Sequence, residues 1–390
     1  MTVPAVSTFS FPTTIDFGVG AVAGLGDRLA GLGVSRPLVV TDGGLVEMAA
    51  FERVREALDA AGVSSPVFSG VEPNPTDANV SAGVEAFKGD ACDGVVAVGG
   101  GSALDVGKTV RLKSTHDEPL IEFDDAKDGA SRIRNEMPPM IAIPTTAGTG
   151  SEVARSAVIT VAEAGRKVII FSPYLIANVA VCDPALTVGL PPHLTASTGM
   201  DALSHNLEAV AATGYHPICE AIGLQGISLV AGHLRKAVTD GDDLMARHQM
   251  LMASMMGAIA FQKGLGAAHS LAHPLSTELG MQHGLANALV LPNVVRFNRE
   301  AAGDAYARAA HYFGASTRRT GDDDVVEAFA TAIEQLNADI GLPGSLSAAG
   351  VSRDDLPRLA DLAFEDACHT LNPRPCNRDD LLALYEAACG

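Results

Sequence analysis

The first half of the chain alternates short apolar, β-branched runs with stretches of helical periodicity. The apolar runs predict strands at 37–41, 64–69, 94–98 and 140–143, and the intervening stretches predict helices at 48–61, 76–88 and 105–113. Apolar strands joined by helices occur almost only in parallel sheets that are covered on both faces. The sequence therefore predicts an α/β domain built on a parallel sheet.

After about residue 190 the pattern changes to long stretches rich in Ala, Leu and Met. These stretches predict helices at 195–212, 217–238, 242–262 and 322–340, while β-branched runs become rare. Two prolines, Pro191 and Pro192, stand at the change. We therefore predict two domains, an α/β domain at 1–188 and an all-helical domain at 189–390.

The chain is strongly acidic, with 46 acidic and 27 basic residues and a formal net charge of −19. An acidic surface repels phosphate backbones and anionic lipid, which argues against binding to nucleic acid or to a membrane surface. No run approaches the roughly 18 apolar residues of a membrane span. No basic residue precedes Arg28, so we expect no leader peptide. The six cysteines show no paired close spacing, which favours reduced thiols and a cytoplasmic location.

Three consecutive glycines, Gly99, Gly100 and Gly101, precede Ser102 between a predicted strand and the next helix. Glycine lets the backbone approach a phosphate closely, and the free amides at a helix start favour an anion. Open α/β sheets also bind ligands at the carboxyl ends of their strands. The motif therefore predicts a phosphate-binding loop, with a tight strand–helix turn as the alternative.

Two further elements follow predicted strands. The loop 144–152 offers hydroxyl and backbone donors to phosphate or ribose oxygens. Its hydroxyl residues include Thr145, Thr146 and Thr149. Asp42 follows the strand 37–41, where a carboxylate accepts from a ribose 2′-hydroxyl and repels a 2′-phosphate. These elements favour NAD over NADP, although Asp42 could equally form the turn before the next two glycines.

Five residues of the second half are candidate metal ligands: Asp201, His205, His269, His273 and His283. Asp201 and His205 are four apart on a predicted helix, so they share one face. His269 and His273 are also four apart, and His283 lies ten residues further on. One carboxylate and three imidazoles suit Fe²⁺ or Zn²⁺. Spacing alone leaves five candidates for four positions, and a core or surface role is the alternative for any single histidine.

Taken in order, these motifs resemble the iron-containing (group III) alcohol dehydrogenase family over nearly the whole chain. The resemblance rests on the glycine turn with Asp105 and Lys108, the loop 144–152, and the runs 198–205, 264–274, 283–292 and 372–374. It implies a Rossmann-like dinucleotide-binding domain followed by an all-helical, metal-binding catalytic domain. It also implies a homodimer or a higher homo-oligomer.

The same resemblance implies roles for the candidate residues. It makes Asp201, His205, His269 and His283 the metal ligands, and it leaves His273 unligated as a proton relay near the nicotinamide. The implied cofactor contacts are Asp42, Gly99, Gly100, Gly101, Ser102, Asp105, Thr145, Thr146, Thr149 and Lys167. The implied reaction transfers hydride between NAD(H) and a short-chain primary alcohol, diol or hydroxy acid, with Fe²⁺ or Zn²⁺ as the Lewis acid.

Two cations bear on the substrate. Arg155 stands just past the loop 144–152, and Lys263 stands just before the run 264–274. In an otherwise acidic protein they could bind an anionic tail such as that of 4-hydroxybutyrate, or they could simply pair with nearby acids.

Two other activities fit the motifs. One is a zinc-dependent polyol dehydrogenase of the glycerol type. The other is an NAD- and metal-dependent lyase resembling dehydroquinate synthase, which would need an array of basic residues for a phosphorylated substrate.

Overall fold

The computed structural model describes residue 11, residues 13–315 and residues 322–390. Its internal contacts divide these residues into two compact units. The first, which we call the α/β unit, comprises Phe11–Thr146 and Gly150–Leu190. The second, which we call the helical unit, comprises Pro191–Gly390 together with the short segment Ala147–Thr149. The change of unit thus falls two residues after the predicted position, and one loop segment joins the second unit.

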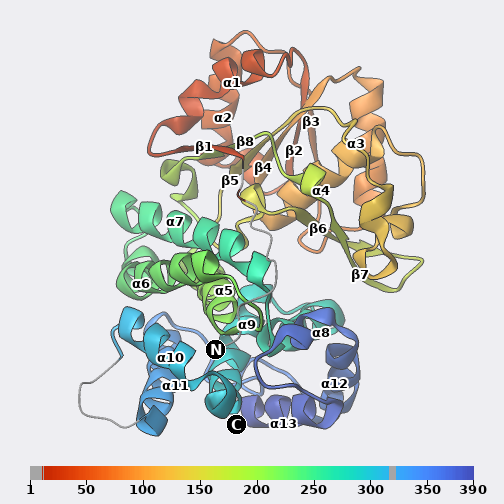
Figure 1. Ribbon diagram of the computed structural model, residues 1–390. Helices are drawn as coiled ribbons and strands as arrows, with labels where there is room; N and C mark the ends of the chain where they lie inside the picture. The colour runs from red at the N-terminus through yellow and green to blue at the C-terminus, as the bar shows by residue number, and fades with distance from the viewer. Residues whose placement is uncertain (1–10, 12, 316–321) are drawn as a thin grey trace. The chain divides into compact units, whose positions relative to one another are not determined.

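The α/β unit is built on a six-stranded sheet with the order β1-β8-β5-β4-β2-β3, in which every pair is parallel (Figure 1). The strands are β1 (Thr14–Phe17), β2 (Pro37–Asp42), β3 (Val67–Val71), β4 (Gly94–Gly99), β5 (Met140–Pro144) and β8 (Val179–Cys182). The predicted parallel sheet is confirmed. The third strand begins later than predicted because Pro66 precedes it, and proline has no N–H to donate to a ladder.

Both faces of the sheet are covered, as the continuous apolar strands predict. On β4, Val96 and Val98 join one core cluster with residues of α1 (Leu25–Gly31) and α2 (Ala49–Ala60). The alternate residues, Val95 and Ala97, join a second cluster on the opposite face. That face is covered by α3 (Asp77–Gly89), α4 (Gly101–Lys113) and an antiparallel hairpin of β6 (Ser156–Val161) and β7 (Arg166–Phe171).

The register of the sheet brings two predicted loops together. Gly99 at the end of β4 pairs with Pro144 at the end of β5. The backbone amide of Thr145 donates to the carbonyl oxygen of Gly99 at 3.0 Å. The glycine turn and the start of the loop 144–152 therefore lie side by side at the carboxyl edge of the sheet.

The helical unit contains no strand among its described residues (Figure 1). Its helices are α5 (Pro192–Ala211), α6 (Pro217–Thr239), α7 (Leu244–Ala260), α8 (Ala267–Leu279), α9 (His283–Phe297), α10 (Arg299–Phe313), α11 (Asp322–Asp339), α12 (Leu356–Glu365) and α13 (Arg378–Cys389). The helix α5 packs against α6, α7 and α9 and is buried along most of its length, so it forms the centre of this core. Within the described residues, no helix has the length and apolar character needed to cross a bilayer.

Candidate metal centre and cofactor loops

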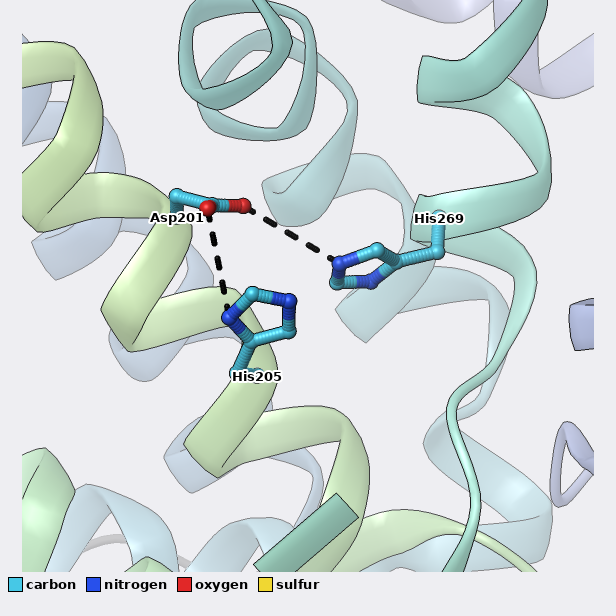
Figure 2. Close-up of side chains that lie close together, drawn as sticks. All are labelled: Asp201, His205 and His269. Atoms are coloured by element: carbon cyan, nitrogen blue, oxygen red, sulfur yellow. Dashed lines mark ion pairs between the residues drawn. The ribbon is translucent and has the colours of Figure 1, made fainter. Parts of the chain in front are cut away.

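The central helix α5 carries the first two candidate ligands. Asp201 and His205 are both buried, and His205 Nδ1 lies 4.0 Å from Asp201 Oδ2 (Figure 2). Gly257 on α7 lets that helix come close, because a Cβ there would lie 2.9 Å from the Cβ of His205. The predicted spacing of four residues therefore places both side chains on one buried face of α5.

Two further helices bring imidazoles to the same carboxylate. His269 on α8 places Nε2 4.0 Å from Asp201 Oδ1 (Figure 2). His283, the first residue of α9, places Nε2 3.6 Å from the same oxygen. One carboxylate and three imidazoles from α5, α8 and α9 thus converge, as the metal-ligand prediction requires.

The chemistry of this cluster fits a divalent metal ion. Ligand atoms of Asp201, His205 and His269 all lie within 4.8 Å of one another, and the buried Nδ1 of His205 has no hydrogen-bond partner among the described residues. Although burial opposes it, the surrounding imidazoles lower the pKa of Asp201. Burial and the neighbouring His205 hold the pKa of His269 well below its ordinary value. An ionised carboxylate and neutral imidazoles are the states that bind Fe²⁺ or Zn²⁺.

Two buried residues that the motifs did not single out support the cluster. Glu208 on α5 accepts from the amide of Ala268 at 2.7 Å, and burial raises the pKa of Glu208 to about 7. Asn287 on α9 donates from Nδ2 to Asp201 Oδ1 at 3.0 Å. Glu208 stands seven residues after Asp201, and Asn287 stands four after His283, so helical spacing from the ligands could have identified both.

His273, the predicted proton relay, lies beside the cluster and forms its hydrogen bond with Asp366. Its Nδ1 lies 2.7 Å from Asp366 Oδ2, and its ring stacks on that of His283 at 5.2 Å between centroids. The other oxygen of Asp366 accepts from Ser270 Oγ at 2.7 Å. Although burial opposes it, the hydrogen bonds and charge of these neighbours hold the pKa of Asp366 far below its ordinary value. With 23% of its side chain exposed, His273 remains accessible to a small molecule.

The predicted phosphate loop has the backbone that a close approach requires. Gly99 adopts a φ of +146°, which L-residues with side chains rarely adopt. A Cβ at Gly100, which immediately precedes α4, would lie 3.4 Å from the side chain of Thr146. Ser102 is the exception in this motif, because its hydroxyl already donates to the carbonyl of Pro73 at 2.7 Å.

Asp42 closes the turn that follows β2. Its Oδ1 accepts from the amides of Gly44 at 3.0 Å and Leu45 at 2.8 Å. One of the two carboxylate oxygens therefore forms the turn, as the alternative interpretation expects. A Cβ at Gly99 would lie 3.7 Å from the other oxygen, Oδ2, which therefore faces the glycine turn. Asp42, the glycine turn and Thr146 thus lie at one edge of the sheet.

The remaining predicted cofactor residues occupy different surroundings. Asp105 accepts from Ser151 Oγ at 2.6 Å and from the amide of Val158 at 3.0 Å, which anchors α4 to the hairpin. Lys167 on β7 is partly buried, and burial lowers its pKa while Asp105 opposes that shift. Thr149 lies in the short segment that belongs to the helical unit.

The two candidate substrate cations differ in their surroundings. Arg155 in the α/β unit is half-buried and lies 5.3 Å from the ring centre of Phe171. In the helical unit, Lys263 has only 4% of its side chain exposed and binds Glu220 Oε1 at 2.8 Å. Its ammonium also donates to the carbonyl of Val210 at 3.0 Å. Lys263 is therefore paired with a nearby acid, Glu220, as the alternative interpretation expects. Arg155 remains the candidate for binding the anionic tail of a substrate.

Comparisons with known proteins give the family. A family profile described as iron-containing alcohol dehydrogenase matches residues 12–184, and one described as the C-terminal part of the Fe-containing alcohol dehydrogenase family matches residues 195–389. A 4-hydroxybutyrate dehydrogenase from Cupriavidus necator is 40% identical over 383 residues, which cover 96% of this chain and 97% of that protein. A 1,3-propanediol dehydrogenase from Citrobacter freundii is 39% identical over 380 residues, which cover 97% of both chains.

Solved structures agree with this match and confirm the resemblance read from the motifs. A 1,3-propanediol oxidoreductase has a TM-score of 0.94 at 38% identity, covering 98% of this chain and 100% of its own. A sulfoacetaldehyde reductase from Bifidobacterium kashiwanohense, solved in complex with NAD⁺, has a TM-score of 0.89 at 31% identity and covers 99% of both chains. The chain therefore belongs to the iron-containing alcohol dehydrogenase family.

Proposed function

We propose that this protein is a metal- and NAD-dependent alcohol dehydrogenase that also catalyses the reverse reaction, the reduction of an aldehyde. The observation that carries the proposal is the convergence of Asp201, His205, His269 and His283 in the helical unit. A buried carboxylate and three imidazoles that converge on one point offer the ligand atoms that a divalent ion takes, so the cluster is best explained as a binding site for such an ion. When bound there, Fe²⁺ or Zn²⁺ supplies the Lewis acidity that polarises the oxygen of an alcohol or aldehyde.

The protein's own residues would handle the proton. His273 is fixed through Nδ1 by Asp366, which leaves Nε2 as its second site for a proton. Its ring stacks on the ligand His283, so it lies next to the cluster without being one of the four ligands. In alcohol oxidation His273 would take up the proton released from the substrate hydroxyl, and in aldehyde reduction it would return one.

The α/β unit would bind NAD. The glycine turn with its positive-φ Gly99, together with Thr145 and Thr146, supports pyrophosphate binding at the start of α4. Among the described residues, both hydrogen bonds of Asp42 end on Oδ1, so Oδ2 can accept from a ribose 2′-hydroxyl. The same charge would repel the 2′-phosphate of NADP.

The proposed substrates are short-chain primary alcohols, diols and hydroxy acids. Relatives named for 4-hydroxybutyrate and 1,3-propanediol favour this class. Arg155 would bind the anionic tail of a hydroxy acid, because an arginine fork matches a carboxylate. The pairing of Lys263 with Glu220 supports a structural role for that lysine.

Further properties belong to the proposal as expectations. We propose a cytoplasmic enzyme that assembles as a homodimer or a higher homo-oligomer. A zinc-dependent polyol dehydrogenase of the glycerol type remains the alternative, whereas membership of the alcohol dehydrogenase family argues against the lyase resembling dehydroquinate synthase.

The experiment is an NADH-coupled screen of protein stripped of metal and reloaded separately with Fe²⁺ or Zn²⁺. We expect activity on 1,3-propanediol and 4-hydroxybutyrate, and none from the metal-free protein. Highest activity on glycerol with Zn²⁺ would favour the polyol alternative, and no redox activity with any alcohol or aldehyde would contradict the proposal.

Variants at the two cations test the substrate class. Arg155→Ala should lower kcat/KM for 4-hydroxybutyrate by roughly tenfold, the loss of one charged hydrogen bond, and leave 1,3-propanediol unchanged. Lys263→Ala should change both substrates to the same extent. Equal effects of Arg155→Ala on the neutral and the anionic substrate would exclude Arg155 from substrate binding.

A further inference from the structure

The buried carboxylate of Glu208 binds the start of α8 with both of its oxygens. The residue is 5% exposed, and its side chain reaches from α5 to the first turn of α8. Its Oε1 accepts from the amide of Ala268 at 2.7 Å, and its Oε2 lies 2.5 Å from His269 Nδ1. The backbone of Gly266 also hydrogen-bonds to this carboxylate. An ordinary helix cap would need only the backbone contacts, so the bond to the imidazole calls for a separate explanation.

The contact with Glu208 determines which ring nitrogen of His269 carries the proton. The backbone amides that donate to Glu208 favour its ionised form, and an ionised carboxylate can only accept, so Nδ1 is the donor in this hydrogen bond. A neutral imidazole has a single N–H, which leaves a lone pair on Nε2. That nitrogen is the one that faces Asp201, at 4.0 Å from Oδ1. The hydrogen bond to Glu208 therefore turns the lone pair of His269 toward the cluster.

The sequence around α8 keeps this contact short. A Cβ at Gly266 would lie 3.0 Å from Glu208 Oε1 and 2.9 Å from Asn372 Oδ1, so a side chain there would push both acceptors away. Asn372 Oδ1 accepts from the amide of Ala267 at 3.2 Å, beside the bond from Ala268 to Glu208. Asn372 and Glu208 thus both accept from amides in the first turn of α8. Of these two residues, only Glu208 also hydrogen-bonds to the imidazole of His269.

We propose that Glu208 is a positioning residue that fixes the tautomer and orientation of His269, so that Nε2 is ready to bind the divalent ion. This inference rests on the proposed metal centre. A carboxylate behind a ligand histidine fixes the ring and raises its basicity, and losing such a partner typically costs 10–100-fold in metal affinity. Glu208 itself makes no contact with substrate or cofactor in this role.

The test is the Zn²⁺ affinity of Glu208→Gln, measured on the full-length, metal-stripped chain by competition with a chromophoric chelator. Glutamine keeps the shape but presents an amide NH₂ toward groups that are all donors, so it cannot satisfy both the amide of Ala268 and a protonated His269 Nδ1. We expect the Kd for Zn²⁺ to rise by about 10–100-fold. A folded Glu208→Gln protein with an unchanged Kd would overturn the inference.

A matched control separates this effect from the loss of any buried carboxylate. Glu152 in the α/β unit is 1% exposed, and burial raises its pKa to about 7, as for Glu208. Because Glu152 belongs to the α/β unit and the four candidate ligands belong to the helical unit, Glu152→Gln should keep the Zn²⁺ affinity of the wild type. An equal loss in both variants would contradict a specific role for Glu208. Failure of the wild-type chain to bind Zn²⁺ would instead contradict the metal centre itself.

A measurement on the wild type keeps the inference testable if Glu208→Gln does not fold. Long-range ¹H–¹⁵N spectra of metal-free protein with ¹⁵N-labelled histidine report the tautomer of each ring, and His269→Gln assigns the relevant signal by its loss. We expect the proton of His269 on Nδ1. A proton on Nε2 would overturn the inference.

Discussion

Gly284, next to the candidate ligand His283, lies where α9 comes very close to the backbone of α5. A Cβ at this position would lie 2.0 Å from the carbonyl oxygen of Ser197 and 3.1 Å from the Cβ of Asp201. Backbone cannot yield as a flexible side chain can, so Gly284→Ala must push the first turn of α9 away from α5 by roughly 1 Å. That movement would separate His283 from Asp201. In the wild type, His283 Nε2 lies 3.6 Å from Asp201 Oδ1.

We expect Gly284→Ala to affect both stability and function. Overpacking at one core position costs about 1–3 kcal/mol of unfolding free energy. A displacement of about 1 Å at a reacting centre can lower the rate by roughly 100-fold. The variant should therefore show a lower urea midpoint, weaker Zn²⁺ binding, and a kcat/KM for 1,3-propanediol reduced by about two orders of magnitude.

A second glycine substitution is the control. Gly232 lies inside α6, is exposed, and has nothing within 4 Å of an added Cβ. Alanine there should stabilise the protein by about 0.5–1 kcal/mol, because glycine is the poorer helix former, and should leave activity unchanged. If Gly284→Ala kept wild-type metal affinity and kcat/KM, the close approach of α9 to α5 would not be what positions His283.

Three further predictions address other parts of the molecule. Asp42→Gly should lower the ratio of kcat/KM for NAD over NADP by at least about tenfold, the loss of one charged hydrogen bond, and an unchanged ratio would exclude Asp42 from cofactor choice. Asp366→Asn should lower kcat by roughly 100-fold with Zn²⁺ affinity unchanged, because it removes the charge beside His273 and replaces one of two acceptor oxygens with a donor; an unchanged kcat would exclude that role. Burial raises the pKa of Glu152 from 4.5 to about 7, so the folded state holds this proton more tightly and loses stability as pH rises through that interval. In urea unfolding, Glu152→Gln should therefore be more stable than wild type above pH 7, by up to about 3 kcal/mol, and the difference should vanish toward pH 4; a constant difference would contradict the shift.

Much of the fold could be predicted from local pattern. The strands β4 and β5, and β2 as far as Val40, are apolar because both faces of the sheet are covered, and such runs are visible in the sequence. The hairpin of β6 and β7 was not predicted, although its residues alternate between buried and partly exposed positions. The hairpin forms a separate two-stranded sheet, so the alternation of strands and helices in the main sheet does not predict it.

The residues of the candidate site likewise differ in whether local sequence pattern could identify them. Spacing of four residues on a helix could find Asp201 with His205, because neighbours on a helix surface are fixed by its geometry. The partners Glu208 and Asn287 also stand at helical spacing from a ligand, but the contacts between helices that give them a role are visible only in the structure. For the same reason the sequence could not show that Lys263 is paired with Glu220.

The most direct test of the proposed metal-dependent hydride transfer is a pair of measurements on His269→Ala. Turnover of 1,3-propanediol with NAD and binding of NADH should be measured on the same preparation, before and after treatment with a chelator. Because His269 belongs to the helical unit and the glycine turn to the α/β unit, we predict that turnover falls to background while NADH binding persists. Undiminished turnover by His269→Ala after chelation would contradict the role of the metal.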